Sequence, residues 1–211
     1  RIHADSQARR RASVEPVSAQ DLMRFLFAWQ HVAEDDRLEG PAGVARVVEQ
    51  LQGFAVAAGA WESEVLAARL RGYRPEWLDP HCLSGRVSWL RLAPPTGERE
   101  AGRRATSRST PLSLELREDL SWLLQAHRGQ SSAADVGSRE GPSPPGTACE
   151  GLATPPLADR IIPLLVRRGA LFHRELVEAL GEPAVDVEAA LWDLVARGRV
   201  GADGFQAVRS L

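Results

Sequence analysis

The sequence contains no lysine: all 26 of its basic residues, in a chain of 211, are arginine. A phosphate-binding loop of the GxxxxGK[ST] type requires lysine, so the chain cannot hold a nucleotide in that way. Patterns of the GxGxxG, GxSxG and HExxH types are also absent. These absences leave no recognisable motif for nucleotide hydrolysis, dinucleotide binding, serine hydrolysis or zinc proteolysis.

Cysteine is scarce, and its spacing argues against two kinds of site. Cys82 lies in a helix-like run and Cys149 in a stretch rich in proline and glycine, and neither has a CxxC partner. We therefore predict no zinc site and no disulfide framework. This cysteine usage is typical of a reducing cytoplasm, which we expect as the location.

Long apolar runs are missing as well. No run reaches the roughly 18 residues of a membrane span, and no signal peptide opens the chain, so we expect no membrane partner. The first residues, Arg1-Ile2-His3, are typical of a helix interior and indicate a piece of a longer protein.

A large excess of charge is also lacking. The 26 arginines and 28 acidic residues give a formal net charge of -2. Many nucleic-acid-binding proteins carry a broad positive field, which this composition cannot produce. Any contact with nucleic acid must therefore be local.

The histidines do not form a recognisable catalytic motif. They are scattered one by one, at His3, His31, His81, His127 and His173. His81 precedes Cys82, but neighbouring side chains on a helix point about 100° apart and do not form a dyad. We predict no catalytic residue and no metal ligand in this chain.

The chain does contain one structural plan used twice. From Gly53, and again from Gly169, an apolar quartet precedes a helix-like run, a glycine-containing turn, a second helix-like run and a strand. In each unit a glycine ends the last helix and a valine starts the strand. Two helices joined by a tight turn and followed by a β-hairpin form a winged helix. The sequence thus predicts a mainly α fold with small β-hairpins (α+β), built from two winged-helix domains.

Apolar spacing predicts the elements of the first unit. Its first helix carries Val44, Val47, Val48 and Leu51, its second Trp61, Val65, Leu66 and Leu70, and its third Trp77, Leu78 and Leu83. Leu112, Leu114 and Leu116 alternate as in a strand. The loop 93–111 before that strand is too long for a tight turn. It is either a basic wing tip or an insertion, and a short helix over 118–126 follows the strand.

The second unit has the same kind of pattern. Its three helices carry Ile161, Leu164 and Leu165, then Leu176, Val177 and Leu180, then Val187, Leu191, Leu194 and Val195. Asp203-Gly204 predicts a two-residue hairpin between Val200 and Val208.

Two further segments complete the predicted domain organisation. Leu22, Phe25, Leu26 and Trp29 share a helical face of the kind that usually packs in a core. Nearly half of residues 127–156 are proline, glycine or serine, a composition that predicts disorder. The predicted parts are a helical segment that completes a preceding domain (1–39), a winged helix (40–126), a disordered linker (127–156) and a second winged helix (157–211).

Local arginine clusters are the candidates for DNA contact. The third helix of the second unit carries Asp186, Glu188 and Asp193, which would repel phosphates, so it is a poor reader of a major groove. Arginine suits phosphate because its forked guanidinium is permanently charged. The candidate residues are Arg9, Arg10, Arg11, Arg69, Arg71, Arg74, Arg86, Arg103, Arg104 and Arg108.

A long, ordered series of segments carries a family resemblance. It includes Glu15-Pro16-Val17-Ser18, Ala28-Trp29-Gln30-His31-Val32, Glu49-Gln50-Leu51-Gln52-Gly53, Arg117-Glu118-Asp119-Leu120 and Gly169-Ala170-Leu171-Phe172. In these segments the chain resembles the carboxy-terminal half of the bacterial large helicase-related family, Lhr. The loop 93–111 and the linker 127–156 depart from the compact pattern of that family.

The resemblance implies a parent protein that is a superfamily 2 ATP-dependent DNA helicase linked to DNA repair. ATP and Mg²⁺ would belong to the motor domains of that parent, with no cofactor in this region. The implied partners are DNA and the motor domains of the same polypeptide. The winged helices would be similar in arrangement to those of a class of DNA glycosylases.

Three functions remain open from the sequence. The region is a DNA-binding accessory part of a helicase, a protein-interaction scaffold that packs on the motor, or part of a glycosylase-like repair module. A basic stripe shared by the first winged helix and residues 1–11 would favour the first function, and scattered arginines would favour the second.

Overall fold

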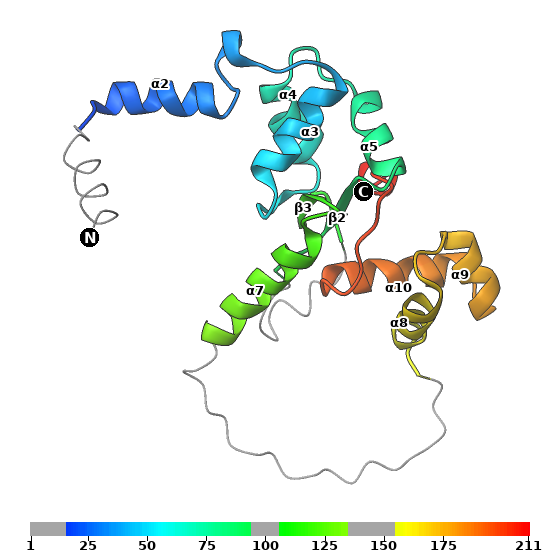
Figure 1. Cartoon of the computed structure of the whole chain (residues 1–211). Helices are drawn as coiled ribbons and strands as arrows, with labels where there is room; N and C mark the ends of the chain where they lie inside the picture. Colours follow the sequence, from blue (N-terminus) through cyan, green and yellow to red (C-terminus); the bar gives the residue numbers. More distant parts are fainter. Residues whose placement is uncertain (1–15, 94–105, 135–154) are drawn as a thin grey trace.

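The computed structural model describes residues 16–93, 106–134 and 155–211 (Figure 1). The elements are α2 (Ala19–Trp29), η1 (Glu34–Asp36), α3 (Gly40–Leu51), β1 (Val56–Ala57), η2 (Trp61–Leu66), α4 (Ala67–Arg69), η3 (Pro75–Trp77), α5 (Asp79–Leu83), β2 (Val87–Leu90), β3 (Pro111–Leu116), α7 (Leu120–Ala134), α8 (Leu157–Arg168), α9 (His173–Leu180), α10 (Ala184–Ala196) and α11 (Gln206–Arg209). Mostly helical with one small antiparallel sheet, the structure confirms the α+β class. None of the helices in these ranges has the length and apolar composition needed to cross a membrane.

The elements from α3 to β3 form a winged helix, in the order that the sequence predicts. Strand β3 lies between β1 and β2, and both pairings are antiparallel. Along the β2–β3 pair, Val87 lies opposite Leu116 and Leu90 opposite Ser113. Helix α3 has Pro41 in its first turn, where the missing N–H of proline costs no hydrogen bond.

The apolar residues predicted for this winged helix lie in its core or pack against it, with one exception. Trp61, Leu66 and Leu78 are fully buried, and the Trp61 indole N–H donates to the carbonyl of Leu112 at 2.8 Å. Leu83 was expected to face inward, but its side chain is 81% exposed. That prediction is wrong because α5 ends at Leu83 and its neighbour Cys82 takes the inward place.

Strand β3 is buried on both of its faces. Its three leucines alternate as predicted, and Ser113 and Glu115, which alternate with them, are also buried. A strand at the centre of a sheet can be covered on both sides, and then the period-two pattern does not mean that one face meets solvent. As a result the carboxyl group of Glu115 is fully buried, which is unusual for an acidic side chain.

The second unit is a three-helix bundle of α8, α9 and α10. Its core contains Ile161, Leu176, Val187 and Leu194, as the sequence predicts. The hairpin expected between Val200 and Val208 does not form, and α11 occupies part of that segment instead.

The reason for the missing hairpin is a contact with the first unit. Ala202 forms a bridge with Trp89 of β2, with N–H to oxygen distances of 2.8 and 3.0 Å in the two directions. Phe205 and Val208 pack into the core cluster of the first winged helix. The segment after α10 therefore adds to the first sheet rather than making a second wing.

The structure differs from two other predictions, one for α2 and one for the helix after β3. The stripe on α2 was expected to be core, yet no residue of α2 is buried. The helix expected over 118–126 runs from Leu120 to Ala134 as α7. Residues 127–134, which the prediction counts in the disordered linker, are helical. Residues 135–154 lie outside the described ranges, so the disorder of that part and the domain boundaries at 39, 126 and 156 stay predictions.

Candidate nucleic-acid interface

Half of the ten candidate arginines can be located. Arg9, Arg10, Arg11, Arg103 and Arg104 lie outside the described residues. The structure locates Arg69, Arg71, Arg74, Arg86 and Arg108, all of them in or beside the first winged helix.

Arg69 is committed to internal contacts. Its guanidinium donates to the carbonyl of Val65 and to the side-chain oxygen of Gln30, both at 3.1 Å. Its Nε is buried and has no hydrogen-bond partner in the described part of the chain, and burial lowers the pKa of the group. Arg69 therefore holds the turn after α2 against α4 and is a poor candidate for a phosphate contact.

Arg71 makes weaker contacts at the surface. Its guanidinium donates to the carbonyl of Glu34 at 3.2 Å and lies 3.5 Å from the carboxylate of Glu39. Both side chains of the ion pair are more than half exposed, so water screens the attraction and the pair contributes little. A phosphate could replace Glu39 at a small cost.

Arg74, Arg86 and Arg108 are exposed, and within the described residues none of them forms an ion pair. Arg74 directly precedes η3, and Arg86 follows the turn that ends α5. Arg108 precedes β3, and its carbonyl accepts from the N–H of Gly59 at 2.8 Å. These three side chains are available for phosphates, whereas Arg69 is not.

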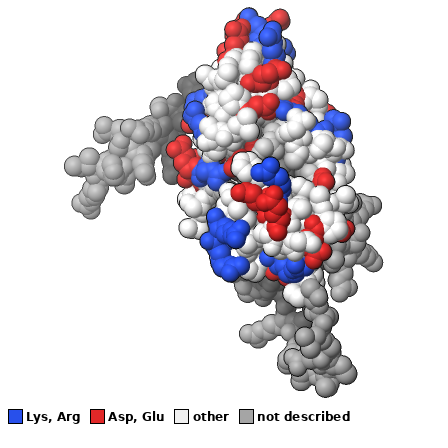
Figure 2. Space-filling model, turned by 90° about the vertical axis from the view of Figure 1, so that its right-hand side faces the viewer, with Lys and Arg blue, Asp and Glu red and all other residues white. Residues whose placement is uncertain are grey.

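The arginines do not merge into one broad positive surface on the face that Figure 2 displays, where arginine and acidic side chains are interspersed. In the second unit, Asp186 and Glu188 are exposed on α10, and Asp193 pairs with Arg197. Two of the three acidic residues of α10 thus face solvent, and the expectation that this helix is a poor reader of a major groove stays a prediction. Contacts between single exposed arginines of the first winged helix and DNA phosphates are the arrangement that suits DNA here.

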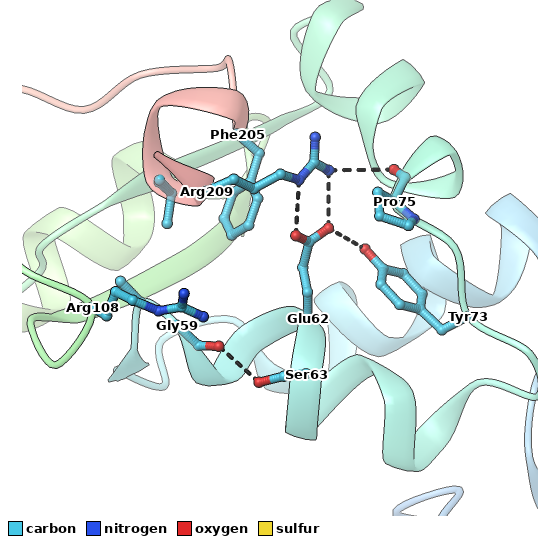
Figure 3. Close-up of a pocket in the computed structure, with 10 residues that line it drawn as sticks. Gly59, Glu62, Ser63, Tyr73, Pro75, Arg108, Phe205 and Arg209 are labelled. Atoms are coloured by element: carbon cyan, nitrogen blue, oxygen red, sulfur yellow. Dashed lines mark hydrogen bonds and ion pairs between the residues drawn. The ribbon is translucent and has the colours of Figure 1, made fainter. Parts of the chain in front are cut away.

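A pocket of about 320 Å³ lies next to Arg108, where α11 meets the first winged helix (Figure 3). Glu62 is its central polar group. Its carboxylate accepts from the hydroxyl of Tyr73 at 2.6 Å and from Arg209 at 2.8 and 2.9 Å. Arg209 also donates to the carboxylate of Asp79 at 2.6 Å and lies 5.6 Å from the centre of the Phe205 ring.

The electrostatics of this pocket are those of a structural clamp. Hydrogen bonding to Glu62 raises the pKa of Arg209, so the guanidinium stays charged. Burial, and then the hydrogen bond to Glu62, raise the pKa of Tyr73, so the phenol stays protonated. Neither group exchanges a proton near neutral pH. The network fixes α11 against η2 and η3.

Another unusual group is Glu115, in the centre of β3. Its two carboxylate oxygens accept from the N–H of Gly53 at 2.9 and 3.0 Å. Burial raises its pKa to about 7, against the effect of that hydrogen bond. No local pattern indicates this burial, because alternating leucines in a strand usually leave the residues between them on a solvent-facing side.

Among the described residues, neither a reactive thiol nor a group of metal ligands is found. The thiol of Cys82 is buried, and burial raises its pKa to about 12, so it is unreactive at neutral pH. No three histidine, cysteine or acidic side chains among the described residues gather where they could hold a metal ion.

Sequence reasoning missed the residues that join the two units. Asp203 accepts from the hydroxyl of Ser88 at 2.8 Å and pairs with Arg117. The rings of Trp89 and Trp192 stack with their centres 5.8 Å apart. No local pattern reveals such contacts, since the partners are 86 or more residues apart.

Comparison with known proteins gives consistent results for the whole chain. A family model described as "Large helicase-related protein, winged-helix domain" matches residues 17–107. The chain is 31% identical over 208 residues to "Lhr helicase/ probable uracil glycosylase" of Mycolicibacterium smegmatis, an alignment that covers 98% of the chain and 12% of that protein. It is 28% identical over 230 residues to "Lhr helicase/uracil glycosylase" of Escherichia coli, covering 100% of the chain and 13% of that protein.

The chain thus spans only a small part of the length of these relatives. The matched range contains the elements of the winged helix from α3 to β2 but not β3, and the alignments extend over β3 and the second unit as well. The order of elements, the family match over residues 17–107 and the two alignments agree, and they show that the chain is similar to the winged-helix region of large helicase-related (Lhr) proteins.

Proposed function

We propose that this chain is a DNA-binding accessory region of an Lhr-type helicase, in which the first winged helix grips the phosphate backbone. The observation that carries the proposal is the set of exposed arginines that have no acidic partner among the described residues, Arg74, Arg86 and Arg108, on a winged helix similar to that of a helicase family. Arg71 is a fourth contact, since its surface pair with Glu39 is weak. Arg9, Arg10, Arg11, Arg103 and Arg104 remain candidates from the sequence.

The contacts are with phosphates rather than with base edges. Helix α5, which follows the tight turn as a reading helix would, has only five residues. Its Asp79 is already paired with Arg209, and the acidic α10 is unsuited to a major groove. A protein that contacts phosphates fixes its position on DNA without reading sequence. The region therefore guides DNA, and it does so with little sequence preference.

The motor, with its ATP and Mg²⁺, would lie elsewhere in the parent polypeptide. This chain lacks the lysine that a phosphate-binding loop needs, so it supplies no nucleotide site of that type. The same proposal includes two properties of the parent protein: it acts on DNA in the cytoplasm, and it takes part in DNA repair. Residues 1–211 would hold the strand that the motor moves.

A salt titration of the chain with single-stranded and duplex DNA tests the proposal. The double variant Arg74→Ala/Arg86→Ala removes two phosphate contacts, each of which contributes roughly 0.9 to the slope of log affinity against log salt. We expect the slope to become shallower by about two, with equal effects on unrelated sequences.

The matched control is Arg174→Ala. Arg174 is exposed on α9 of the second unit, outside the winged helix that is proposed to contact phosphates, so its removal should leave the slope unchanged. Circular dichroism checks that all variants are folded. No binding at low salt, or binding that does not depend on salt, would reject the DNA role and favour a protein-interaction scaffold.

A second candidate function comes from the names of the relatives. Both are called uracil glycosylase, one of them with the word "probable". The region would then be the DNA-holding part of a glycosylase-like repair module. The test is uracil release from an oligonucleotide by the parent protein carrying Arg74→Ala/Arg86→Ala. Release that falls together with DNA affinity supports this role, and unchanged release excludes it.

A further inference from the structure

Helix α2 exposes more large apolar side chains than any other element described. Figure 1 shows it projecting from the rest of the chain. None of its residues is buried. The α2 surface, as we call it, consists of Leu22, Met23, Phe25, Leu26, Phe27 and Trp29, whose exposed fractions lie between 37% and 58%. Large contiguous apolar surfaces on a folded protein usually mark a contact with another protein surface.

The apolar residues cover more than half of the helix circumference. At roughly 100° per residue, the arc from Phe25 through Leu22 and on to Phe27 spans roughly 200°. A helix on the surface of a globular protein has a narrower stripe, and a helix that is apolar nearly all round is enclosed by other elements. The α2 surface is therefore suited to insertion into a cleft rather than to a flat contact.

Helix α2 is already formed and held in position before any partner binds. Its start is capped by Ser18, whose hydroxyl accepts from the N–H of Asp21 at 3.1 Å. At its end, the carbonyl of Trp29 accepts from the side chain of Gln50 at 2.7 Å. The adjacent Gln30 is bound by Arg69 at 3.1 Å. These contacts fix the direction in which the surface projects from α3 and α4.

A hollow at the base of α2 continues the same surface. It has a volume of about 490 Å³ and is lined by residues that include Trp29, Arg46, Glu49 and Gln50. The side-chain oxygen of Gln50 is buried there and has no hydrogen-bond partner among the described residues. A buried acceptor normally has a donor, so the hollow fits a partner that brings one.

Two possible occupants are poorly suited to this surface. Residues 1–15 contain only Ile2 and Val14 as large apolar residues, too few to cover six apolar side chains. A second copy of the chain would offer an identical helix, and two such helices side by side leave much of a 200° arc uncovered, given roughly 100° per residue.

The length of the relatives indicates the occupant. The chain covers 12% and 13% of the two Lhr proteins, so most of an Lhr polypeptide lies outside the region that it matches. A segment of the same polypeptide is present at a high effective concentration, which favours docking without a large intrinsic affinity. We propose that the α2 surface inserts into an apolar cleft of another domain of the same Lhr polypeptide.

Cysteine accessibility in the parent protein tests this proposal. Phe25→Cys places a thiol within the α2 surface, and Arg24→Cys places one on the opposite, polar side of the same helix. Each is labelled with a maleimide, in the 211-residue chain and in the parent, and the labelled peptide is quantified by mass spectrometry. We expect position 25 to react at least ten-fold more slowly in the parent, and position 24 to react equally in both.

Equal reaction rates at position 25 in the chain and in the parent would overturn the proposal. So would protection of position 25 in the 211-residue chain that grows with protein concentration, because that result identifies a second copy as the occupant. A second pair of variants is independent of labelling. Leu22→Asp/Leu26→Asp should leave the unfolding midpoint of the 211-residue chain unchanged and should expose α2 to protease in the parent.

Discussion

Arg209 donates two hydrogen bonds to the carboxylate of Glu62, although the two residues are 147 positions apart in the chain. Both side chains are less than one-fifth exposed. The pair therefore lies in a region where water screens charge weakly. Through it, the short helix α11 is attached to the helices of the first winged unit.

Replacing Arg209 with alanine should lower the free energy of unfolding by about 2 kcal/mol, since it leaves the partly buried carboxylates of Glu62 and Asp79 without their charged donor. Urea unfolding measures the change. Arg174→Ala is the matched control, because Arg174 is 86% exposed and forms a surface pair with Glu178 on α9. The control should change stability by less than about 0.5 kcal/mol. Equal effects of the two substitutions would contradict the clamp.

Leu194→Ala should cost about 2–5 kcal/mol, the usual range for a buried leucine. Leu194 is 1% exposed in the core of the second unit. Leu191, one turn earlier, is only partly buried against the same core, so Leu191→Ala should cost less. Thermal or urea unfolding of both variants provides the comparison. The reverse order would mean that α10 turns a different face to α8 and α9.

Glu115 should make the stability of the protein depend on pH. Its folded pKa of about 7 is above the ordinary value of 4.5, so the folded state binds more protons between these values. The free energy of unfolding should therefore fall as the pH rises from about 4.5 to about 7, by at most about 3 kcal/mol, and then level off.

Urea unfolding at several pH values between 4.5 and 8 measures this effect. Glu115→Gln should flatten the fall, because the amide does not titrate. The exposed neighbour Glu118 provides the control, and Glu118→Gln should keep the pH dependence of the unmodified protein. If the Glu115→Gln variant keeps the same profile, another group causes it.

The composition of residues 127–156 predicts early cleavage by a nonspecific protease. Helix α7 runs to Ala134, so the first cuts should fall after it rather than at the start of the linker. Mass spectrometry of the early fragments identifies the sites. If the core of either unit is cleaved at the same time as residues 135–154, the prediction that these residues form a disordered linker is wrong.

Local patterns predicted the first winged helix well. Proline at a helix start, apolar residues at helical spacing and alternating leucines each act within a few residues, and α3, η2 and β3 follow from them. The order of elements was correct for the same reason. The end of α5 was less predictable, since Cys82 and Leu83 compete for one inward position.

Long-range contacts explain the failures. Asp203-Gly204 is a good hairpin signal, but the carbonyl of Gly204 accepts from the indole of Trp89, and this packing determines the local conformation. In the same way, pairing of Arg69 with Gln30 removes a candidate phosphate ligand. Both effects depend on partners that the local sequence does not contain. The arginine clusters indicated where to look for an interface but could not separate free side chains from committed ones.

The bridge between Trp89 and Ala202, with Phe205 and Val208 in the first core, has a consequence for biosynthesis. Residues 40–116 leave the ribosome well before residues 202–208, so the first winged helix emerges without the segment that finishes its core. Contacts between residues so far apart in sequence form late and slow the folding of a domain. Until they form, the edge of β2 is open to pairing with other chains, and a chaperone that shields it would raise the yield of correctly folded protein.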